Sequence, residues 1–295
     1  MEYVTLSNGI LMPKLGYGVY QIDKEDCERC VIDAIKTGYR LIDTAQSYFN
    51  EEEVGNAIQK SGIARNELFI TTKVWIEHYG YESTKKSVLE SMQKLKTDYL
   101  DLCLLHQPFA DSYGAWHALE DLYEENKIRA IGISNFYPDR MVDFASFNKI
   151  KAMVNQVERH IYNQQKILGE YAKKYDIALE AWAPFGEGRG GTFENPVIAD
   201  LAKKYNKTPA QIMLRWNIQC GVVVIPKSTH IERMKENFNV FDFSIEKSDM
   251  DKINELDKKT SSFFNHEDPA MVEWFVKMVG ERKSKTNSSK ENKNW

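Results

Sequence analysis

Short apolar runs alternate with amphipathic segments along most of the chain. Short apolar runs bounded by polar or glycine residues are typical of buried strands, and we expect strands at residues 15–18, 39–43, 68–73, 100–106, 130–134, 152–156, 177–182 and 222–226. The segments between and after them carry apolar residues at helical spacing, which predicts helices at residues 24–37, 51–60, 82–96, 113–126, 138–147, 165–175, 196–219, 231–237 and 247–258. Eight strands each followed by a helix are the pattern of a (β/α)8 TIM barrel.

The two ends of the chain depart from this alternation. Residues 3–6 and 10–12 flank Ser7-Asn8-Gly9, and an Asn-Gly pair between apolar runs is a strong hairpin signal. We expect this N-terminal β-hairpin to cap the bottom of the barrel, and a C-terminal loop and helix to extend it. Residues 281–295 are polar and predict a disordered tail. Since no linker divides the rest, residues 1–280 are expected to form a single domain.

Composition narrows the class of protein. The chain has 295 residues, 42% of them hydrophobic, and a net charge of −4. This charge gives no global basic field for nucleic acid or an anionic membrane. The N-terminus lacks the basic-then-apolar order of a signal peptide, and no apolar run approaches the roughly 20 residues of a membrane helix. We therefore expect a cytoplasmic protein. Without an exposed heptad or a long edge strand, a monomer is the default.

The four cysteines are too few for a disulfide framework in a chain of this length. Two of them form the motif Cys27-Glu-Arg-Cys30, which is compatible with a redox or metal pair. No second such motif exists to complete a zinc site, and the pair lies inside a predicted amphipathic helix. We therefore interpret both cysteines as structural.

Polar residues follow three of the predicted strands and provide candidate chemistry. Asp43, Lys73 and His106 close separate apolar runs, and Tyr48 lies shortly after Asp43. Side chains at the carboxyl ends of several strands form the active site of an α/β barrel. A lysine ammonium lowers the pKa of a nearby tyrosine, and a carboxylate holds that lysine charged. Tyr48 could then donate a proton to a carbonyl oxygen that His106 orients. The alternative is a structural ion pair with a core histidine.

These residues also carry a resemblance. Gly38-Tyr-Arg-Leu-Ile-Asp-Thr-Ala45 with Tyr48, Leu68-Phe-Ile-Thr-Thr-Lys-Val-Trp75 and Asp101-Leu-Cys-Leu-Leu-His106 resemble signatures of the aldo-keto reductases. The likeness extends over residues 4–243 and is closest to bacterial reductases of diketogluconate or methylglyoxal. It implies carbonyl reduction with Tyr48 as the acid, Lys73 and Asp43 tuning it, and His106 orienting the substrate. The family often has an aromatic residue after this histidine, where this chain has Gln107.

No side chain supplies hydride, so a cofactor is required. Residues 186–191 satisfy GxGxxG, but they come late and lack a βαβ frame, which favours a glycine-rich loop over a dinucleotide fold. A better anion site follows the last strand, where Lys227 precedes a helix that contains Arg233 and that Ser228 or Thr229 can cap. Helix N-termini and arginine forks bind phosphate, and barrels often bind one here. A solvated basic helix start remains the alternative.

The resemblance adds detail to this cofactor site. It implies NADPH rather than NADH, with the adenosine 2′-phosphate held near Lys227 and Ser228. It also implies that Ser134, Asn135 and Gln156 hold the nicotinamide carboxamide and that Trp182 stacks on the ring. Arg233, Glu236 and Asn237 would bind the adenine and the 2′-phosphate.

The substrate pocket is less well defined. Tyr20, Trp75, Gln107 and Phe109 follow early strands and could line it, although aromatic side chains are equally often core residues. Aromatics together with Gln107 favour small aldehydes, dicarbonyls or keto-sugar acids.

Two other functions are compatible with the same fold. A non-catalytic NADPH-binding sensor or regulatory subunit would not need a tuned tyrosine. A Schiff-base enzyme using Lys73 or Lys227 would need a lysine with a lowered pKa, whereas Asp43 should raise the pKa of Lys73.

Overall fold

The computed structural model describes residues 1–291. Two compact units divide it, Met1–Ser262 and Phe263–Trp295, and each is described by itself. In the first unit the strands are β1 (Tyr3–Thr5), β2 (Leu11–Pro13), β3 (Gly16–Gly18), β4 (Leu41–Asp43), β5 (Phe69–Val74), β6 (Leu102–Leu105), β7 (Ile131–Ser134), β8 (Val154–Glu158), β9 (Ala178–Trp182) and β10 (Val223–Val224). The 3-10 turns are η1 (Gln46–Tyr48), η2 (Arg65–Glu67), η3 (Ile76–His78) and η4 (Gly186–Gly191).

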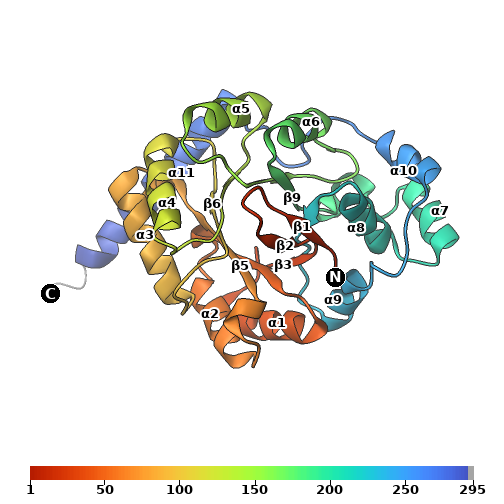
Figure 1. Ribbon diagram of the computed structural model, residues 1–295, viewed down its shortest axis with the longest axis horizontal. Helices are drawn as coiled ribbons and strands as arrows, with labels where there is room; N and C mark the ends of the chain where they lie inside the picture. The colour runs from red at the N-terminus through yellow and green to blue at the C-terminus, as the bar shows by residue number, and fades with distance from the viewer. Residues whose placement is uncertain (292–295) are drawn as a thin grey trace. The chain divides into compact units, whose positions relative to one another are not determined.

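The helices of the first unit surround its strands (Figure 1). They are α1 (Lys24–Thr37), α2 (Glu51–Lys60), α3 (Tyr81–Lys94), α4 (Ser112–Glu124), α5 (Pro138–Phe147), α6 (Lys166–Tyr175), α7 (Pro196–Tyr205), α8 (Pro209–Gln219), α9 (Ile231–Phe238) and α10 (Lys247–Asn254). None of the helices in the described part of the chain combines the length and apolar character needed to cross a lipid bilayer.

The parallel sheet is the predicted barrel. Within residues 1–291 its eight strands are ordered from β3 to β10 as they occur in the chain, each paired in parallel with the next. A parallel bridge between Leu15 and Val224 joins the two ends of this order. Strand residues such as Ile42, Ile70 and Leu104 are fully buried, as expected when helices cover a parallel sheet. The (β/α)8 prediction is confirmed.

The N-terminal hairpin is also confirmed. β1 and β2 pair antiparallel, and Gly9 in the turn has a φ of 86°, which favours glycine. Asn8 Nδ2 donates to the carbonyl of Arg129 at 2.9 Å, just before β7 begins, and Glu2 forms an ion pair with Arg215 of α8 at 2.6 Å. The hairpin therefore contacts the end of the barrel at which the strands start.

One predicted helix is wrong in its extent. Residues 196–219 form two helices, α7 and α8, rather than one. Pro209 is the first residue of α8, and the Thr208 hydroxyl caps the N–H of Gln211 while the Gln211 side chain returns to the N–H of Thr208. Proline lacks the N–H that a continuous helix needs, so the helix stops and a capping box starts the next one.

The second unit contains the helix α11 (Pro269–Glu291), consistent with the C-terminal helix of the predicted extension. This helix includes residues 281–291, for which the sequence predicts a disordered tail, and residues 292–295 lie outside the described residues. The compact first unit ends at Ser262, so the boundary at residue 280 stays a prediction.

Candidate active site

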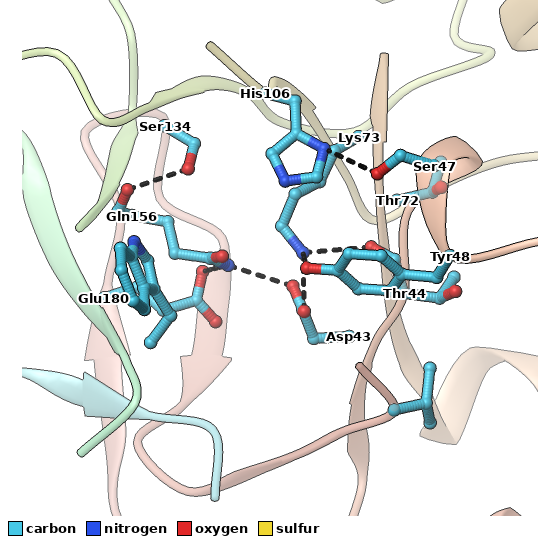
Figure 2. A network of polar contacts seen from close by, with 12 residues as sticks. Asp43, Thr44, Ser47, Tyr48, Thr72, Lys73, His106, Ser134, Gln156 and Glu180 are labelled. Atoms are coloured by element: carbon cyan, nitrogen blue, oxygen red, sulfur yellow. Dashed lines mark hydrogen bonds and ion pairs between the residues drawn. The ribbon is translucent and has the colours of Figure 1, made fainter. Parts of the chain in front are cut away.

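The four residues singled out at strand ends come together inside the barrel (Figure 2). Asp43 is the last residue of β4, Lys73 lies near the end of β5, and His106 directly follows β6. Tyr48 ends the short turn η1 that follows β4. Because parallel strands present their carboxyl ends on one rim, residues far apart in sequence meet there.

Lys73 is the centre of the cluster. Its side chain is fully buried, and Nζ donates to Asp43 Oδ1 at 2.6 Å, to the carbonyl of Thr44 at 3.0 Å and to the Tyr48 hydroxyl at 3.4 Å. Burial works to lower the pKa of this ammonium, but Asp43 and Tyr48 more than offset it and the net shift is upward. Lys73 therefore stays charged, which argues against the lowered pKa that a Schiff-base lysine needs.

Tyr48 departs from the expectation that Lys73 lowers its pKa. Burial raises the pKa of Tyr48 to about 12, and the charge of Lys73 only partly offsets this effect. The sequence could not predict which of the two effects on the Tyr48 pKa is larger. It indicates that Lys73 and Tyr48 lie close together, but not how deeply the phenol is buried. Near neutral pH the phenol keeps its proton, as a proton donor must.

His106 lies beside Tyr48. Their ring centroids are 5.7 Å apart, and the His106 ring also packs against Trp75 at 5.1 Å. Nδ1 lies 3.4 Å from the Ser47 hydroxyl, and the His106 carbonyl accepts a hydrogen bond from Asn135. The imidazole is therefore held next to the phenol, where it can orient an oxygen that receives the proton.

The predicted nicotinamide residues form a second connected network. Asn135 Nδ2 donates to Ser134 Oγ at 3.2 Å, and Ser134 Oγ donates to the Gln156 carbonyl at 2.9 Å. Trp182 Nε1 donates to Asn135 Oδ1 at 2.9 Å, and the indole remains partly exposed. A partly exposed ring beside ordered amides fits a flat polar group such as nicotinamide carboxamide.

The sequence reasoning missed Glu180 on β9. It is fully buried, and its Oε2 accepts from Gln156 Nε2 at 2.8 Å, while the same Nε2 donates to Asp43 Oδ2 at 2.9 Å (Figure 2). Burial and the charge of Asp43 raise the pKa of Glu180 to about 8. The available signal was a charged residue in the middle of an otherwise apolar predicted strand.

The predicted anion site lies after β10. Lys227 and Arg233 are exposed, and neither forms an ion pair with another residue of the described chain. Arg233 lies in the first turn of α9, whose cap position is occupied by His230 rather than Ser228 or Thr229. Ser228 Oγ instead accepts from the N–H of His230 at 3.1 Å. Two cations without a carboxylate partner near a helix N-terminus fit a phosphate group.

The other two residues predicted for this site, Glu236 and Asn237, lie in different environments. Glu236 Oε1 accepts from the Thr208 hydroxyl at 2.8 Å, which ties α9 to the start of α8. Asn237 is buried. A role for either in gripping adenine stays a prediction.

The predicted substrate residues differ in exposure. Tyr20 is exposed and its ring lies 4.9 Å from the ring of Tyr48, whereas Trp75 and Gln107 are buried. The backbone of Gln107 exchanges hydrogen bonds with the Tyr79 hydroxyl. Phe109 is partly exposed. Tyr20 and Trp75 thus contact the catalytic cluster directly, while roles for Gln107 and Phe109 stay predictions.

The Cys27–Cys30 pair and the glycine-rich stretch 186–191 both have environments typical of structural residues. Cys27 and Cys30 are buried in α1, and burial raises the pKa of Cys27 to about 12 and also that of Cys30. Both thiols therefore resist ionisation, which suits core residues. Residues 186–191 form the turn η4, with positive φ at several glycines, and α7 begins only at Pro196. This is a loop rather than a tight strand-to-helix turn.

A match to a known protein family identifies the class of protein to which this chain belongs. Residues 6–258 match the model of the aldo/keto reductase family. The chain belongs to this family. It is therefore an oxidoreductase, and the resemblance inferred from the three signature stretches is confirmed.

Relatives of known activity cover nearly the same length. A glyoxal reductase of Bacillus subtilis (strain 168) is 48% identical over 259 residues, 87% of this chain and 93% of the relative. A 9,11-endoperoxide prostaglandin H2 reductase of Trypanosoma cruzi (strain CL Brener) is 46% identical over 258 residues, 86% and 91% of the two chains. Methylglyoxal reductase DkgA of Escherichia coli (strain K12) is 40% identical over 258 residues, 86% and 93%.

Among solved structures, a Bombyx mori aldo-keto reductase in complex with NADP superimposes with a TM-score of 0.85. It is 32% identical, and the match covers 89% of this chain and 95% of that one. The aldo/keto reductase family therefore uses a nicotinamide cofactor.

Proposed function

We propose that this aldo/keto reductase is an NADPH-dependent carbonyl reductase that converts small aldehydes and ketones to alcohols. The observation that carries the proposal is the Tyr48 hydroxyl, 3.4 Å from the ammonium of Lys73 and beside the His106 ring. NADPH, when bound, supplies the hydride. Tyr48 donates the proton to the carbonyl oxygen, and Lys73 stabilises the phenolate that remains.

The residues of this chain divide the remaining work. Asp43 holds Lys73 in place through a 2.6 Å ion pair inside the barrel. His106 orients the carbonyl, and Asn135 fixes His106 by donating to its backbone carbonyl at 3.0 Å. Tyr20 and Trp75 border the reacting oxygen, because their rings contact Tyr48 and His106 respectively. Ser134, Asn135, Gln156 and Trp182 would hold the nicotinamide end of the cofactor.

Small aldehydes and dicarbonyls are the proposed substrates. The glyoxal and methylglyoxal reductases among the relatives support this class, and the prostaglandin endoperoxide reductase shows that the family also includes enzymes named for larger substrates. Action as a monomer in the cytoplasm stays a prediction.

The test is NADPH oxidation against methylglyoxal, glyceraldehyde, nitrobenzaldehyde and a diketo sugar acid, with NADH in parallel. We expect turnover with at least one carbonyl and a preference for NADPH. Tight NADPH binding without turnover on any of them would instead favour the non-catalytic sensor. Absence of both turnover and binding would overturn the cofactor assignment.

Arg233→Ala tests the 2′-phosphate site. Because Arg233 is exposed and without an ion-pair partner in the described residues, we expect its loss to raise the Kd for NADPH roughly 10- to 100-fold, the value of a charge-assisted hydrogen bond. The Kd for NADH, which lacks this phosphate, should change little. Both constants can be measured by quenching of tryptophan fluorescence.

Lys235→Ala is the matched control, since Lys235 lies on the same helix but is paired with Glu232 at 3.0 Å. It removes the same charge and should leave the NADPH affinity nearly unchanged. If Arg233→Ala weakened the binding of NADPH and of NADH equally, the assignment of Arg233 to the 2′-phosphate would be wrong.

A further inference from the structure

Glu180 is a second buried carboxyl beside the catalytic ion pair. Gln156 lies directly across from it in the β8–β9 ladder and donates to both Glu180 Oε2 and Asp43 Oδ2. With its amide protons used in this way, Gln156 can offer a ligand only its oxygen. Within the described chain the remaining oxygen of Glu180, Oε1, is buried and has no hydrogen-bond partner. Such an oxygen is costly on an ionised carboxylate.

The charges around Glu180 are unbalanced. Asp43 on β4 and Lys73 on β5 are the titratable groups that act on it, with Tyr48 on the other side of Lys73. The neighbour on β8 is the neutral Gln156, and the neighbour on β10 is Val223. The Lys73 ammonium already bonds to Asp43. The single ammonium of Lys73 therefore faces two carboxyl groups, those of Asp43 and Glu180. Burial and the charge of Asp43 raise the pKa of Glu180 to about 8.

Glu180 also lies next to the expected nicotinamide position. It precedes Trp182 by two residues on β9, so both side chains are on the same face of the strand. Trp182 in turn donates to Asn135. A nicotinamide ring carries a positive charge in NADP+ and none in NADPH. If the ring is held beside Trp182, a carboxyl at Glu180 would be stabilised as an anion more by the oxidised cofactor than by the reduced one.

We propose that Glu180 is a positioning residue that fixes the Gln156 amide and balances the charge of the nicotinamide by losing a proton when the oxidised cofactor binds. This inference rests on the proposed function for the position of the ring. In proton terms, binding of NADP+ converts the Glu180 carboxylic acid to a carboxylate and releases one proton to solvent. Binding of NADPH leaves the acid protonated and releases none from this group.

Calorimetric titration at pH 7 in buffers of different ionisation enthalpy measures this proton directly. We expect wild-type protein to release on the order of one proton more with NADP+ than with NADPH. The 2′-phosphate is common to both cofactors, so its titration cancels in the difference. Glu180→Gln should abolish the difference and weaken NADP+ relative to NADPH roughly tenfold. Glu120→Gln, which alters a buried carboxyl on α4, should behave as wild type.

Thermal unfolding gives a second measurement that needs no cofactor. Because the folded chain keeps a proton on Glu180 that the unfolded chain loses above its ordinary pKa near 4.5, this group makes stability fall as pH rises toward 8. The Tm of Glu180→Gln minus that of wild type should therefore increase from pH 5 to pH 8. A constant difference would mean that Glu180 is ionised throughout, and would overturn the inference.

The outcomes separate this inference from the proposed function. If both cofactors bind with equal proton release in wild type, the role of Glu180 fails and the reductase assignment stands. If neither cofactor binds, the proposed function fails and the inference fails with it.

Discussion

Replacement of Tyr48 by phenylalanine is expected to lower kcat by roughly 10²- to 10⁴-fold, the usual contribution of a general acid. The hydroxyl is the group that contacts Lys73 at 3.4 Å, and phenylalanine keeps the ring that packs between Tyr20 and His106. The Kd for NADPH should therefore stay nearly unchanged. Steady-state kinetics and fluorescence titration of the same preparation measure both quantities.

Tyr113→Phe is the matched control for this variant. Its hydroxyl also bonds to a charged group, Asp143, but it joins the outer helices α4 and α5. It should retain wild-type turnover. If Tyr48→Phe instead kept most of its activity, another group would have to donate the proton and the assignment of Tyr48 would be wrong.

Removal of the Lys73 ammonium is expected to have the second large effect. In Lys73→Met the phenolate left by proton transfer loses its stabilising charge, and the pKa of Tyr48 rises further because Lys73 is what lowers it. We expect kcat to fall about 100-fold or more. Asp43 also loses its only ion-pair partner in the described chain, which costs roughly 3–5 kcal/mol for a buried pair. Kinetics and urea unfolding separate the two losses.

The double variant Asp43→Asn/Lys73→Met distinguishes chemistry from folding. It removes the buried uncompensated carboxylate, so much of the stability should return while turnover stays low. Recovery of turnover together with stability would indicate that Lys73 is only a structural partner of Asp43.

The hydrophobic pattern predicts the barrel because strand-like and helix-like periodicity alternate regularly along most of the chain. The pattern gives wrong element boundaries where local backbone chemistry, such as a proline or a capping residue, overrides apolar periodicity. Pro209 and the Thr208 cap divide a segment that apolar periodicity alone joins into one helix. The helix α9 begins at Ile231 as predicted, but its N-cap is His230 rather than Ser228 or Thr229, and the Ser228 hydroxyl bonds within its own turn.

The convergence of the polar strand-end residues was predictable from the sequence, whereas their electrostatics and the contacts of Glu180 were not. Asp43, Lys73 and His106 each close an apolar run, so the shared rim of a parallel barrel brings them together. The net pKa of Tyr48 depends on burial against the charge of Lys73, which no sequence pattern quantifies. The contacts of Glu180 were not predictable, because they depend on how the side chains of Gln156 on the neighbouring strand and of Asp43 on the distant strand β4 meet inside the barrel.

Isotopic labelling of the transferred hydrogen tests the proposed hydride transfer most directly. NADPH with deuterium in both positions of the nicotinamide C4 is incubated with the enzyme and the best carbonyl from the substrate panel, and the alcohol product is examined by mass spectrometry. We expect one deuterium on the former carbonyl carbon for each NADPH consumed, with the hydroxyl proton coming from solvent through Tyr48. Consumption of the carbonyl without deuterium in the product would contradict hydride transfer and with it the proposed function.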